Sequence, residues 1–199
     1  MPKLSLYKAI KIGGLRDEEK QKKALTKFGY QLDERLSNGR QSLIAYNPAK
    51  NNVLYVENGT DTSSRKDIVT DLVLASGNIK STERYKESKA VYDAAKAKYK
   101  NALFTDVGSS LGGSLVNYIS KPDDKVILYN PAFTPNQKVR PHVKNYIVKD
   151  DPISIYAPRN ENTTILPNPF SPGQGLKDKY NYLLKTHKSD AIKDANIYV

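Results

Sequence analysis

The stretch NALFTDVGSSLGGSLVNYIS, residues 101–120, decides how this chain is interpreted. It opens with a short apolar run, passes through a glycine-rich turn and continues as a segment with helical character. The turn contains the pattern Gly108-x-Ser110-x-Gly112. Such a turn between a strand and a helix predicts a strained serine whose hydroxyl stands out above a sheet as a nucleophile. The alternative is a glycine-rich turn whose small residues only allow tight packing.

The surroundings of Ser110 favour the first interpretation. Small residues two positions to either side allow the strand and the helix to pack closely around the bend. The backbone amide of Leu111, at the start of the helix, points toward an oxyanion that forms at the serine. The turn is not a P-loop, because no Gly-Lys-Ser/Thr follows, and it lacks the Gly-x-Gly-x-x-Gly spacing of a dinucleotide-binding turn.

A serine nucleophile needs a base, and the base needs an orienting acid. With this type of turn the usual chain order is serine, acid, histidine. Of the two histidines, His187 follows the acidic turn Asp150-Asp151, whereas His142 precedes it. That turn comes directly after the run NYIV, at the strand end where an α/β sheet presents functional groups. The alternatives are a solvated histidine at a helix end and an aspartate that forms a turn before Pro152.

The composition limits the other classes of function. A chain of 199 residues is long enough for one domain with a full core. It has no cysteine, which excludes disulfides, thiolate zinc sites and a cysteine nucleophile, and two histidines are too few for a histidine-rich metal centre.

The net charge of +11 fits a lysine-rich solvated surface, or attraction to nucleic acid or anionic lipid. The lysines are dispersed, with their densest cluster at residues 20–23, so nucleic acid is an unlikely partner.

The N-terminal sequence MPKLSLYKAIKIGG has neither an apolar core of signal-peptide length nor a small-residue cleavage pattern. No window of the chain is long and apolar enough for a membrane span. We therefore expect a protein of the cytoplasm or of a particle rather than one secreted by the conventional route.

Helix and strand patterns alternate along the chain. Residues 16–37 have helical character with Leu25, Phe28 and Leu32 on one face, and residues 42–56 are typical of a β-hairpin. A short amphipathic turn or helix is predicted around Ile68, Leu72 and Val73.

Residues 82–100 predict a clear helix with Thr82 as its N-cap. Its apolar contacts are expected from Tyr85, Val91, Tyr92, Ala95 and Tyr99. Further strands are predicted in ALFTDV, KVILYNP and KNYIVKDD, and the C-terminal segment from LKDKY onward has helical character.

Strands that alternate with helices predict an α/β fold. We expect an α/β-hydrolase fold with a mostly parallel sheet flanked by helices. The whole of residues 1–199 is expected to form one compact domain, with residues 1–40 as an N-terminal helical extension and residues 158–175 as a proline-rich loop.

Four segments, in chain order, resemble motifs of the class 3 lipases, the fungal-type triacylglycerol lipase family of α/β-hydrolases. YVENGTDTSSRKDIVTDL is similar to the family segment with an Arg-Gly-Thr/Ser turn, and FTDVGSSLGGSLV to its Gly-His-Ser-Leu-Gly-Gly elbow. VILYNPAF is similar to its strand ending in a Gly-x-Pro turn, and YIVKDDPISIYAP to its acid turn, in which Asp precedes an apolar pair and proline. With a late histidine, the resemblance covers roughly residues 42–190.

The resemblance implies a catalytic role for three residues. Ser110 is the expected nucleophile, Asp151 the acid and His187 the general base. Asp151 matches the family acid better than Asp150 does, because the apolar pair and proline follow it at the right spacing.

The resemblance also implies an oxyanion hole and a lid. Thr60, after Gly59, matches the position whose backbone amide and hydroxyl complete the oxyanion hole, with the Leu111 amide as partner. Residues 61–76 take the place of the lid. No metal or organic cofactor is implied.

Three departures from the family pattern are visible. Ser109 stands where the family has histidine before the nucleophile, and Asn58 stands where it has the arginine of the Arg-Gly-Thr turn. The lid segment is polar and lacks tryptophan. These differences indicate either a smaller substrate or a degenerate site.

The leading hypothesis is a serine esterase or lipase that hydrolyses carboxylic esters of lipids, or small esters, through an acyl-enzyme. An anionic membrane surface is a candidate platform for it. The alternative is a catalytically degenerate lipase-like scaffold that acts as a structural or virion-associated binding protein. A nucleic-acid-binding module is the third hypothesis, and no motif supports it.

Overall fold

A computed structural model describes residues 2–39, 41–60, 78–134, 137–171 and 176–199. Its strands are β1 (Gln31–Leu32), β2 (Ser42–Asn47), β3 (Asn52–Glu57), β4 (Leu103–Ser109), β5 (Lys125–Tyr129), β6 (Val143–Val148) and β7 (Thr163–Leu166). Its α-helices are α1 (Leu6–Gly13), α2 (Glu18–Thr26), α4 (Glu83–Lys98), α5 (Leu111–Ile119) and α6 (Leu176–His187). Three 3₁₀-helices are η1 (Ile79–Ser81), η2 (Ser154–Tyr156) and η3 (Ser189–Ile192).

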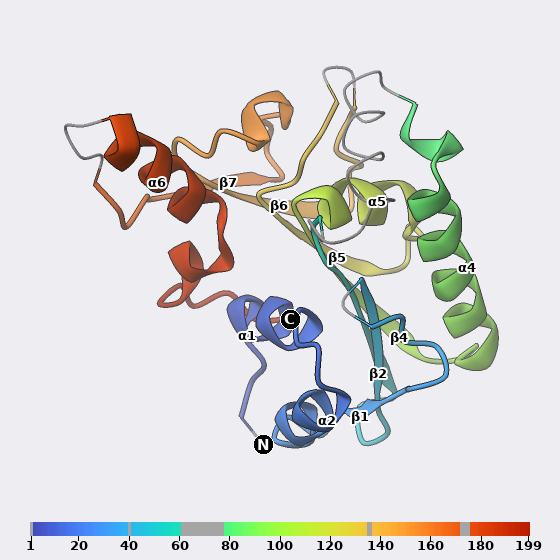
Figure 1. The fold of residues 1–199 in the computed structure, drawn as a ribbon. Helices are drawn as coiled ribbons and strands as arrows, with labels where there is room; N and C mark the ends of the chain where they lie inside the picture. Colours follow the sequence, from blue (N-terminus) through green and yellow to red (C-terminus); the bar gives the residue numbers. More distant parts are fainter. Residues whose placement is uncertain (1, 40, 61–77, 135–136, 172–175) are drawn as a thin grey trace.

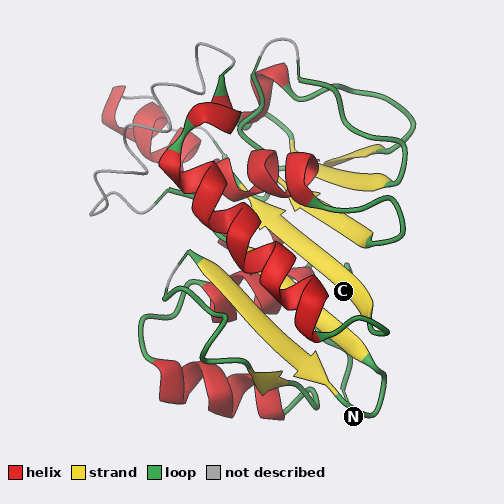
Figure 2. Ribbon diagram, turned by 90° about the vertical axis from the view of Figure 1, so that its right-hand side faces the viewer, coloured by secondary structure: helices red, strands yellow, loops and turns green. Residues whose placement is uncertain are grey.

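The strands form one sheet in which spatial order follows chain order from β1 to β7. The first three strands pair antiparallel, and β3 through β7 pair parallel. The crossovers through α4 and α5 add strands in the same direction, so both helices lie on one face of the sheet. In Figure 2 the long helix in front of the sheet is α4. The expected α/β fold with a mostly parallel sheet is confirmed.

Both faces of the sheet are buried, which explains why apolar residues such as those of β3 and β5 occur in succession along its central strands. Alternate residues of β3 point to opposite faces. Tyr55 packs with the α4 and α5 side, in a cluster that includes Tyr92 and Leu115. Leu54 packs with the other side, which α1, α2 and η3 cover. Figure 1 shows these helices on opposite sides of the strands.

The prediction of one helix over residues 16–37 is wrong beyond α2. Gly29 has φ +78°, a left-handed conformation that glycine adopts without steric cost and that does not continue a helix. The chain turns there and enters β1, where Leu32 pairs with Ala45 of β2. Residues 1–40 are thus helical only in part, and the buried side chains of α1 and α2 pack against the sheet.

The predicted hairpin and the predicted helix after Thr82 are confirmed. Strands β2 and β3 pair over six residues each, and the Thr82 hydroxyl accepts a hydrogen bond from the Tyr85 amide at 3.2 Å. Within the predicted loop at 158–175, the short edge strand β7 was missed.

The amphipathic segment expected around Ile68, Leu72 and Val73 lies outside the described residues. Among the helices described, none has the length and apolar character needed to cross a membrane.

Candidate active site

Ser110 occupies the bend between β4 and α5, as the sequence predicts. Its backbone has φ 53° and ψ −127°, which is unusual for a residue other than glycine. Such strain persists only where the surrounding structure enforces it, and it is common at functional sites. The residue caps α5 with its backbone, and its side chain is not used as a helix cap. Its hydroxyl is therefore available to the pocket above the sheet.

The glycines around Ser110 are required by close approach of the backbone. A Cβ atom on Gly108 would lie 2.6 Å from the carbonyl oxygen of Gly112. A Cβ atom on Gly112 would lie 2.2 Å from the carbonyl oxygen of Glu57. Both separations are far below contact distance, so β3, β4 and α5 meet at this point only because the two positions lack side chains. The spacing Gly-x-Ser-x-Gly is thus a packing requirement of the elbow.

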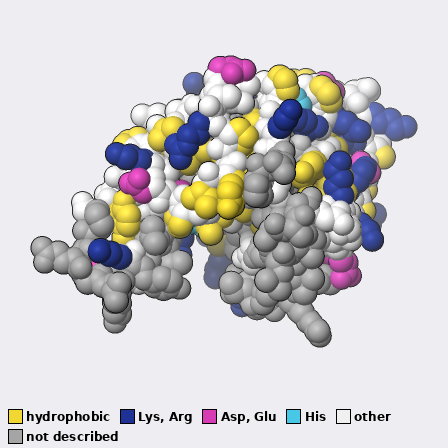
Figure 3. Space-filling view, turned by 90° about the horizontal axis from the view of Figure 1, so that it is seen from above, with side chains coloured by type: hydrophobic (Ala, Val, Ile, Leu, Met, Phe, Trp, Pro, Cys, Tyr) yellow, Lys and Arg dark blue, Asp and Glu magenta, His cyan; other side chains and the backbone are white. Residues whose placement is uncertain are grey.

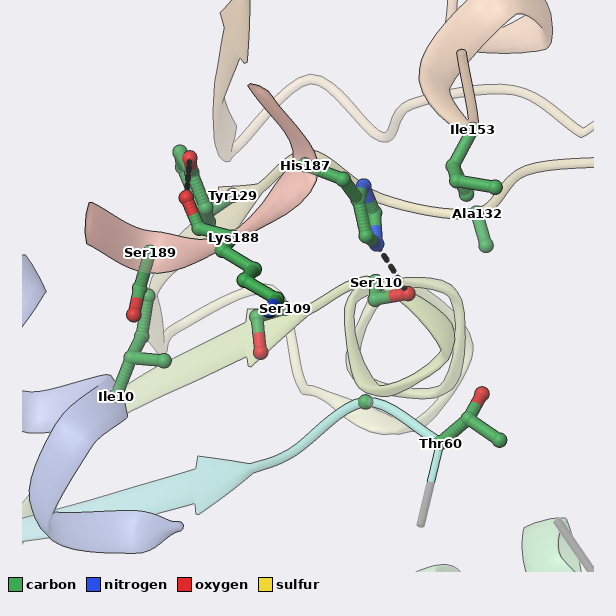
Figure 4. A pocket seen from close by; sticks show the side chains of 11 residues that line it. Ile10, Thr60, Ser109, Ser110, Tyr129, Ala132, Ile153, His187, Lys188 and Ser189 are labelled. Atoms are coloured by element: carbon green, nitrogen blue, oxygen red, sulfur yellow. Dashed lines mark hydrogen bonds between the residues drawn. The ribbon is translucent and has the colours of Figure 1, made fainter. Parts of the chain in front are cut away.

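The last residue of α6, His187, contacts the serine. Its Nε2 atom lies 2.8 Å from Oγ of Ser110, and its Nδ1 atom lies 2.8 Å from Oδ1 of Asp151. The side chain of Asp151 is fully buried, and its second oxygen accepts a hydrogen bond from the Ser154 amide at 3.0 Å. The three residues predicted as nucleophile, acid and base therefore form one connected chain of hydrogen bonds. Figure 4 shows the bond between His187 and Ser110.

The other candidates from the sequence lie elsewhere. The carboxylate of Asp150 accepts a hydrogen bond from the Tyr182 hydroxyl at 3.1 Å, and its backbone has φ +66°. His142 directly precedes β6, whereas Asp151 follows that strand, so the two lie toward opposite ends of it. The structure thus pairs His187 with Asp151 and leaves Asp150 and His142 out of this arrangement.

Two neighbouring residues at the end of β5 hold the backbone around His187, and sequence reasoning missed them. The amide of the fully buried Asn130 donates to the carbonyl of Thr186 at 3.1 Å, and its oxygen accepts from the Val148 amide at 2.8 Å. The hydroxyl of Tyr129 donates to the carbonyl of Lys188 at 2.9 Å. Burial raises the pKa of Tyr129, so the hydroxyl remains a donor. The end of α6 is therefore fixed to the sheet.

The residues predicted to form an oxyanion hole lie beside the serine. Leu111 begins α5, so its amide has no partner within the helix and lies at the positive end of the helix dipole. Gly59 packs so closely that a Cβ atom there would lie 2.8 Å from Cβ of Ser110. Thr60 lines the pocket on the opposite side of Ser110 from His187 (Figure 4). The remainder of the expected lid, residues 61–76, lies outside the described residues.

A buried carboxylate supports the loop that carries Gly59 and Thr60. Glu57, the last residue of β3, is fully buried and accepts hydrogen bonds from three hydroxyl groups. The donors and their distances are Ser42 at 2.6 Å, Tyr55 at 2.6 Å and Ser88 at 2.8 Å. Burial and then the Glu57 charge raise the pKa of Tyr55, so its hydroxyl stays protonated.

The partner of this carboxylate is Arg84, a fully buried residue of α4. Its Nη2 atom lies 2.5 Å from Oε1 of Glu57 and donates to the carbonyl of Asn58 at 3.3 Å. Asn58 stands where the resembled family has an arginine, and here a guanidinium contacts its backbone from another element. On sequence alone, Arg84 has the appearance of a solvated residue in the first turn of a helix.

A pocket of about 560 Å³ opens above Ser110. Its lining residues are Ile10, Gly59, Thr60, Ser109, Ser110, Tyr129, Ala132, Ile153, His187, Lys188 and Ser189. In Figure 4, Ala132 and Ile153 lie on one side of the Ser110–His187 pair, and the other side has Ile10, Ser109, Tyr129, Lys188 and Ser189. The site thus has an apolar side and a mixed side that carries the cationic Lys188.

The charges of the described surface agree with the dispersed lysines of the sequence. Figure 3 shows Lys and Arg side chains spread over this face rather than gathered in one patch. In the part of the chain that the structure describes, no three His, Asp or Glu side chains are grouped so that they could hold a metal ion.

Comparison with known proteins gives a distant structural likeness. No protein-family model matches the chain, and no curated protein matches it in sequence. Similar solved structures are fungal lipases. The Lip2 lipase from Yarrowia lipolytica is 15% identical with a TM-score of 0.47, covering 76% of this chain and 72% of its own. The lipase from Rhizopus microsporus var. chinensis is 13% identical with a TM-score of 0.41, covering 78% and 64%.

The Rhizomucor miehei lipase in its propeptide complex is 12% identical with a TM-score of 0.42, covering 74% of this chain and 60% of its own. These neighbours belong to the family that the sequence motifs resemble. At such identities and TM-scores the likeness identifies no activity for this chain.

Proposed function

We propose that the protein is a serine hydrolase of carboxylic esters, with lipid esters as its substrates. The observation that carries this proposal is the position of His187, which lies 2.8 Å from both the Ser110 hydroxyl and the Asp151 carboxylate. A hydroxyl bonded to an imidazole that is itself held by a buried acid is the arrangement that activates a serine.

In the proposed reaction, Oγ of Ser110 attacks the ester carbonyl carbon while Nε2 of His187 accepts the hydroxyl proton. The carbonyl electrons move to the oxygen, and the Leu111 amide and Thr60 donate hydrogen bonds to it. Asp151 keeps the proton on Nδ1 and stabilises the imidazolium.

The tetrahedral intermediate then collapses. The alcohol leaves with the proton that His187 returns, and the acyl group remains on Ser110. Water attacks this acyl-enzyme with His187 as the base, the carboxylic acid departs, and the serine regains its proton. Every proton in this cycle passes through Nε2 of His187.

Covalent labelling with a fluorophosphonate probe tests the proposal. We expect labelling of the wild type, and none after Ser110→Ala or His187→Ala. His142→Ala and Ser81→Ala are matched controls, because one removes the other histidine and the other removes an exposed serine hydroxyl. The same variants are assayed on short-chain esters dispersed with detergent. A folded wild type that is neither labelled nor active on these esters overturns the proposal and favours a binding role for the scaffold.

A further inference from the structure

The cationic side of the pocket is not used by the proposed chemistry. Lys188 follows α6 directly, and its side chain extends toward Ser109 along the pocket wall (Figure 4). Ser189 lines the same side. Lys188 and Ser109 thus place one ammonium group and one hydroxyl group on the wall beside the Ser110–His187 pair, and Ser189 adds a hydroxyl group farther along the same wall.

Among the residues that the structure describes, none of the ion pairs includes Lys188, and no side-chain hydrogen bond uses the hydroxyl of Ser109 or Ser189. Asp190 pairs with Lys11 at 3.0 Å and accepts from the Tyr7 hydroxyl at 3.2 Å. The hydrogen bond to Lys11 is the main cause that lowers the pKa of Asp190, and the charge of Lys188 contributes less. The described lining of the pocket contains no acidic side chain.

The backbone that carries Lys188 is fixed, so its charge belongs to the site rather than to a loose chain end. The Lys188 carbonyl accepts the hydrogen bond from the buried hydroxyl of Tyr129, and its amide donates to the carbonyl of Lys185 at 3.2 Å. The backbone of Lys188 therefore stays next to His187, while its side chain is exposed to solvent.

The chemistry of the leaving group determines which part of a bound ester lies next to the Lys188 ammonium group. His187 must return its proton to the alcohol oxygen, so the alcohol leaves on the side of the imidazole. Of the two sides of the pocket, the one with Ala132 and Ile153 suits an acyl chain. The other side, with Lys188, is left for the alcohol portion.

We propose that the pocket carries a phosphate subsite formed by Lys188, Ser109 and Ser189, and that the preferred substrates are carboxylic esters of a phosphate-bearing alcohol. Phosphate suits this set because it accepts charge-assisted hydrogen bonds from an ammonium group and further bonds from hydroxyls. The inference rests on the proposed ester hydrolysis. The net charge of +11 attracts the same class of substrate from solution.

The test compares two soluble esters at concentrations below micelle formation, dibutyryl glycerol 3-phosphate and neutral dibutyrylglycerol. The measured quantity is the ratio of their kcat/KM values. We expect the wild type to favour the phosphate ester, and Lys188→Met to lower the ratio by about 10- to 100-fold through a higher KM. Lys188→Arg keeps the preference, and added salt reduces it.

Lys185→Met is the matched control, because it removes an exposed lysine of the same helix end that does not line this pocket. A second assay uses long-chain phosphatidic acid in vesicles as the substrate. Glycerol 3-phosphate is added as a competitor in the vesicle assay and in the assay with soluble esters. A preference seen only on vesicles, and lost equally with Lys185→Met, assigns the effect to the charged surface and overturns the subsite. Equal rates on both soluble esters also overturn it while leaving the proposed function intact. Hydrolysis of neither ester contradicts the proposed function itself.

Discussion

Two buried acid–base pairs flank the elbow at Ser110, and they differ in the exposure of the base. Asp151 and Glu57 each lie at or just beyond the carboxyl end of a strand, with a fully buried side chain. Asp151 pairs with His187, whose ring is 22% exposed and turns its second nitrogen to Ser110. Glu57 pairs with Arg84, which is fully buried.

The comparison shows that the base, rather than the acid, separates a reactive pair from a supporting one. A guanidinium has donors but no acceptor and stays charged, so Arg84 can hold a backbone carbonyl in place but cannot take a proton. An imidazole has a nitrogen that accepts one. Burial of the acid is common to both pairs.

The largest expected effect follows from breaking the reactive pair. In Asp151→Asn the new side chain no longer favours the His187 tautomer that carries its proton on Nδ1. We therefore expect kcat for a short-chain ester to fall by about 10³- to 10⁴-fold. Asp150→Asn, the neighbouring exposed aspartate, serves as the control and should keep its rate within about threefold. A loss smaller than tenfold in Asp151→Asn would contradict the assigned roles.

Breaking the supporting pair should mainly reduce stability. Arg84→Met leaves Glu57 as a buried charge without its partner, which should lower the free energy of unfolding by about 3–5 kcal/mol. Urea unfolding measures the change. The double variant Glu57→Gln/Arg84→Met removes the charge as well, so it should recover a large part of the loss. No recovery in the double variant would mean that packing, and not the ion pair, accounts for the loss.

The next effect tests whether the hydrogen bonds that hold the backbone near His187 contribute to activity. Asn130→Ala leaves the Val148 amide and the Thr186 carbonyl without their side-chain partner, which should lower stability by about 2 kcal/mol and kcat by about tenfold. Asn130→Asp keeps the acceptor and loses the donor, so we expect a smaller loss. If kcat does not change in Asn130→Ala, this residue supports the fold alone.

The last effect depends on pH and concerns a third buried acid, Asp106 of β4, which forms no ion pair among the described residues. Burial, and then the negative charge of Asp124, raise the pKa of Asp106 well above its ordinary value of 3.8. The folded state therefore holds a proton that the unfolded state releases, and stability decreases as the pH rises above about 4.

Asp106→Asn removes this titration. Its stability relative to the wild type should increase between pH 4.5 and pH 8, by at most about 1.4 kcal/mol per pH unit. Urea unfolding at both pH values measures the difference. A difference that does not depend on pH would show that Asp106 is ionised in the folded protein.

The sequence predicts the local features of this molecule well. The elbow at Ser110 was predictable because glycine spacing reflects a close approach within a few residues of chain. His187 followed from the order of functional residues, and the choice of Asp151 over Asp150 followed from the resemblance to the family's acid turn. The hairpin and the helix after Thr82 had clear periodicity and a clear cap, and the structure confirms both.

The missed features depend on contacts between distant parts of the chain. Arg84 and Ser88 lie on the buried side of α4 because Glu57 ends the strand beneath them, and no local pattern reports this. Asn130 has the appearance of an ordinary turn residue until α6 is placed beside it.

Helix α1 differs, because its signals are local. It has a serine N-cap and apolar spacing that the sequence shows, and Ser5 accepts a hydrogen bond from the Lys8 amide.

The position of His187 after the last strand also has a consequence for the timing of activity. The strands pair in the order in which they occur in the chain, so the elbow and the acid turn can be in place while α6 is still free. Until Tyr129 and Asn130 bind the end of that helix, Ser110 has no base. The proposed reactivity therefore requires that the end of α6 is docked on the sheet, and recovery of probe labelling during refolding would report that docking.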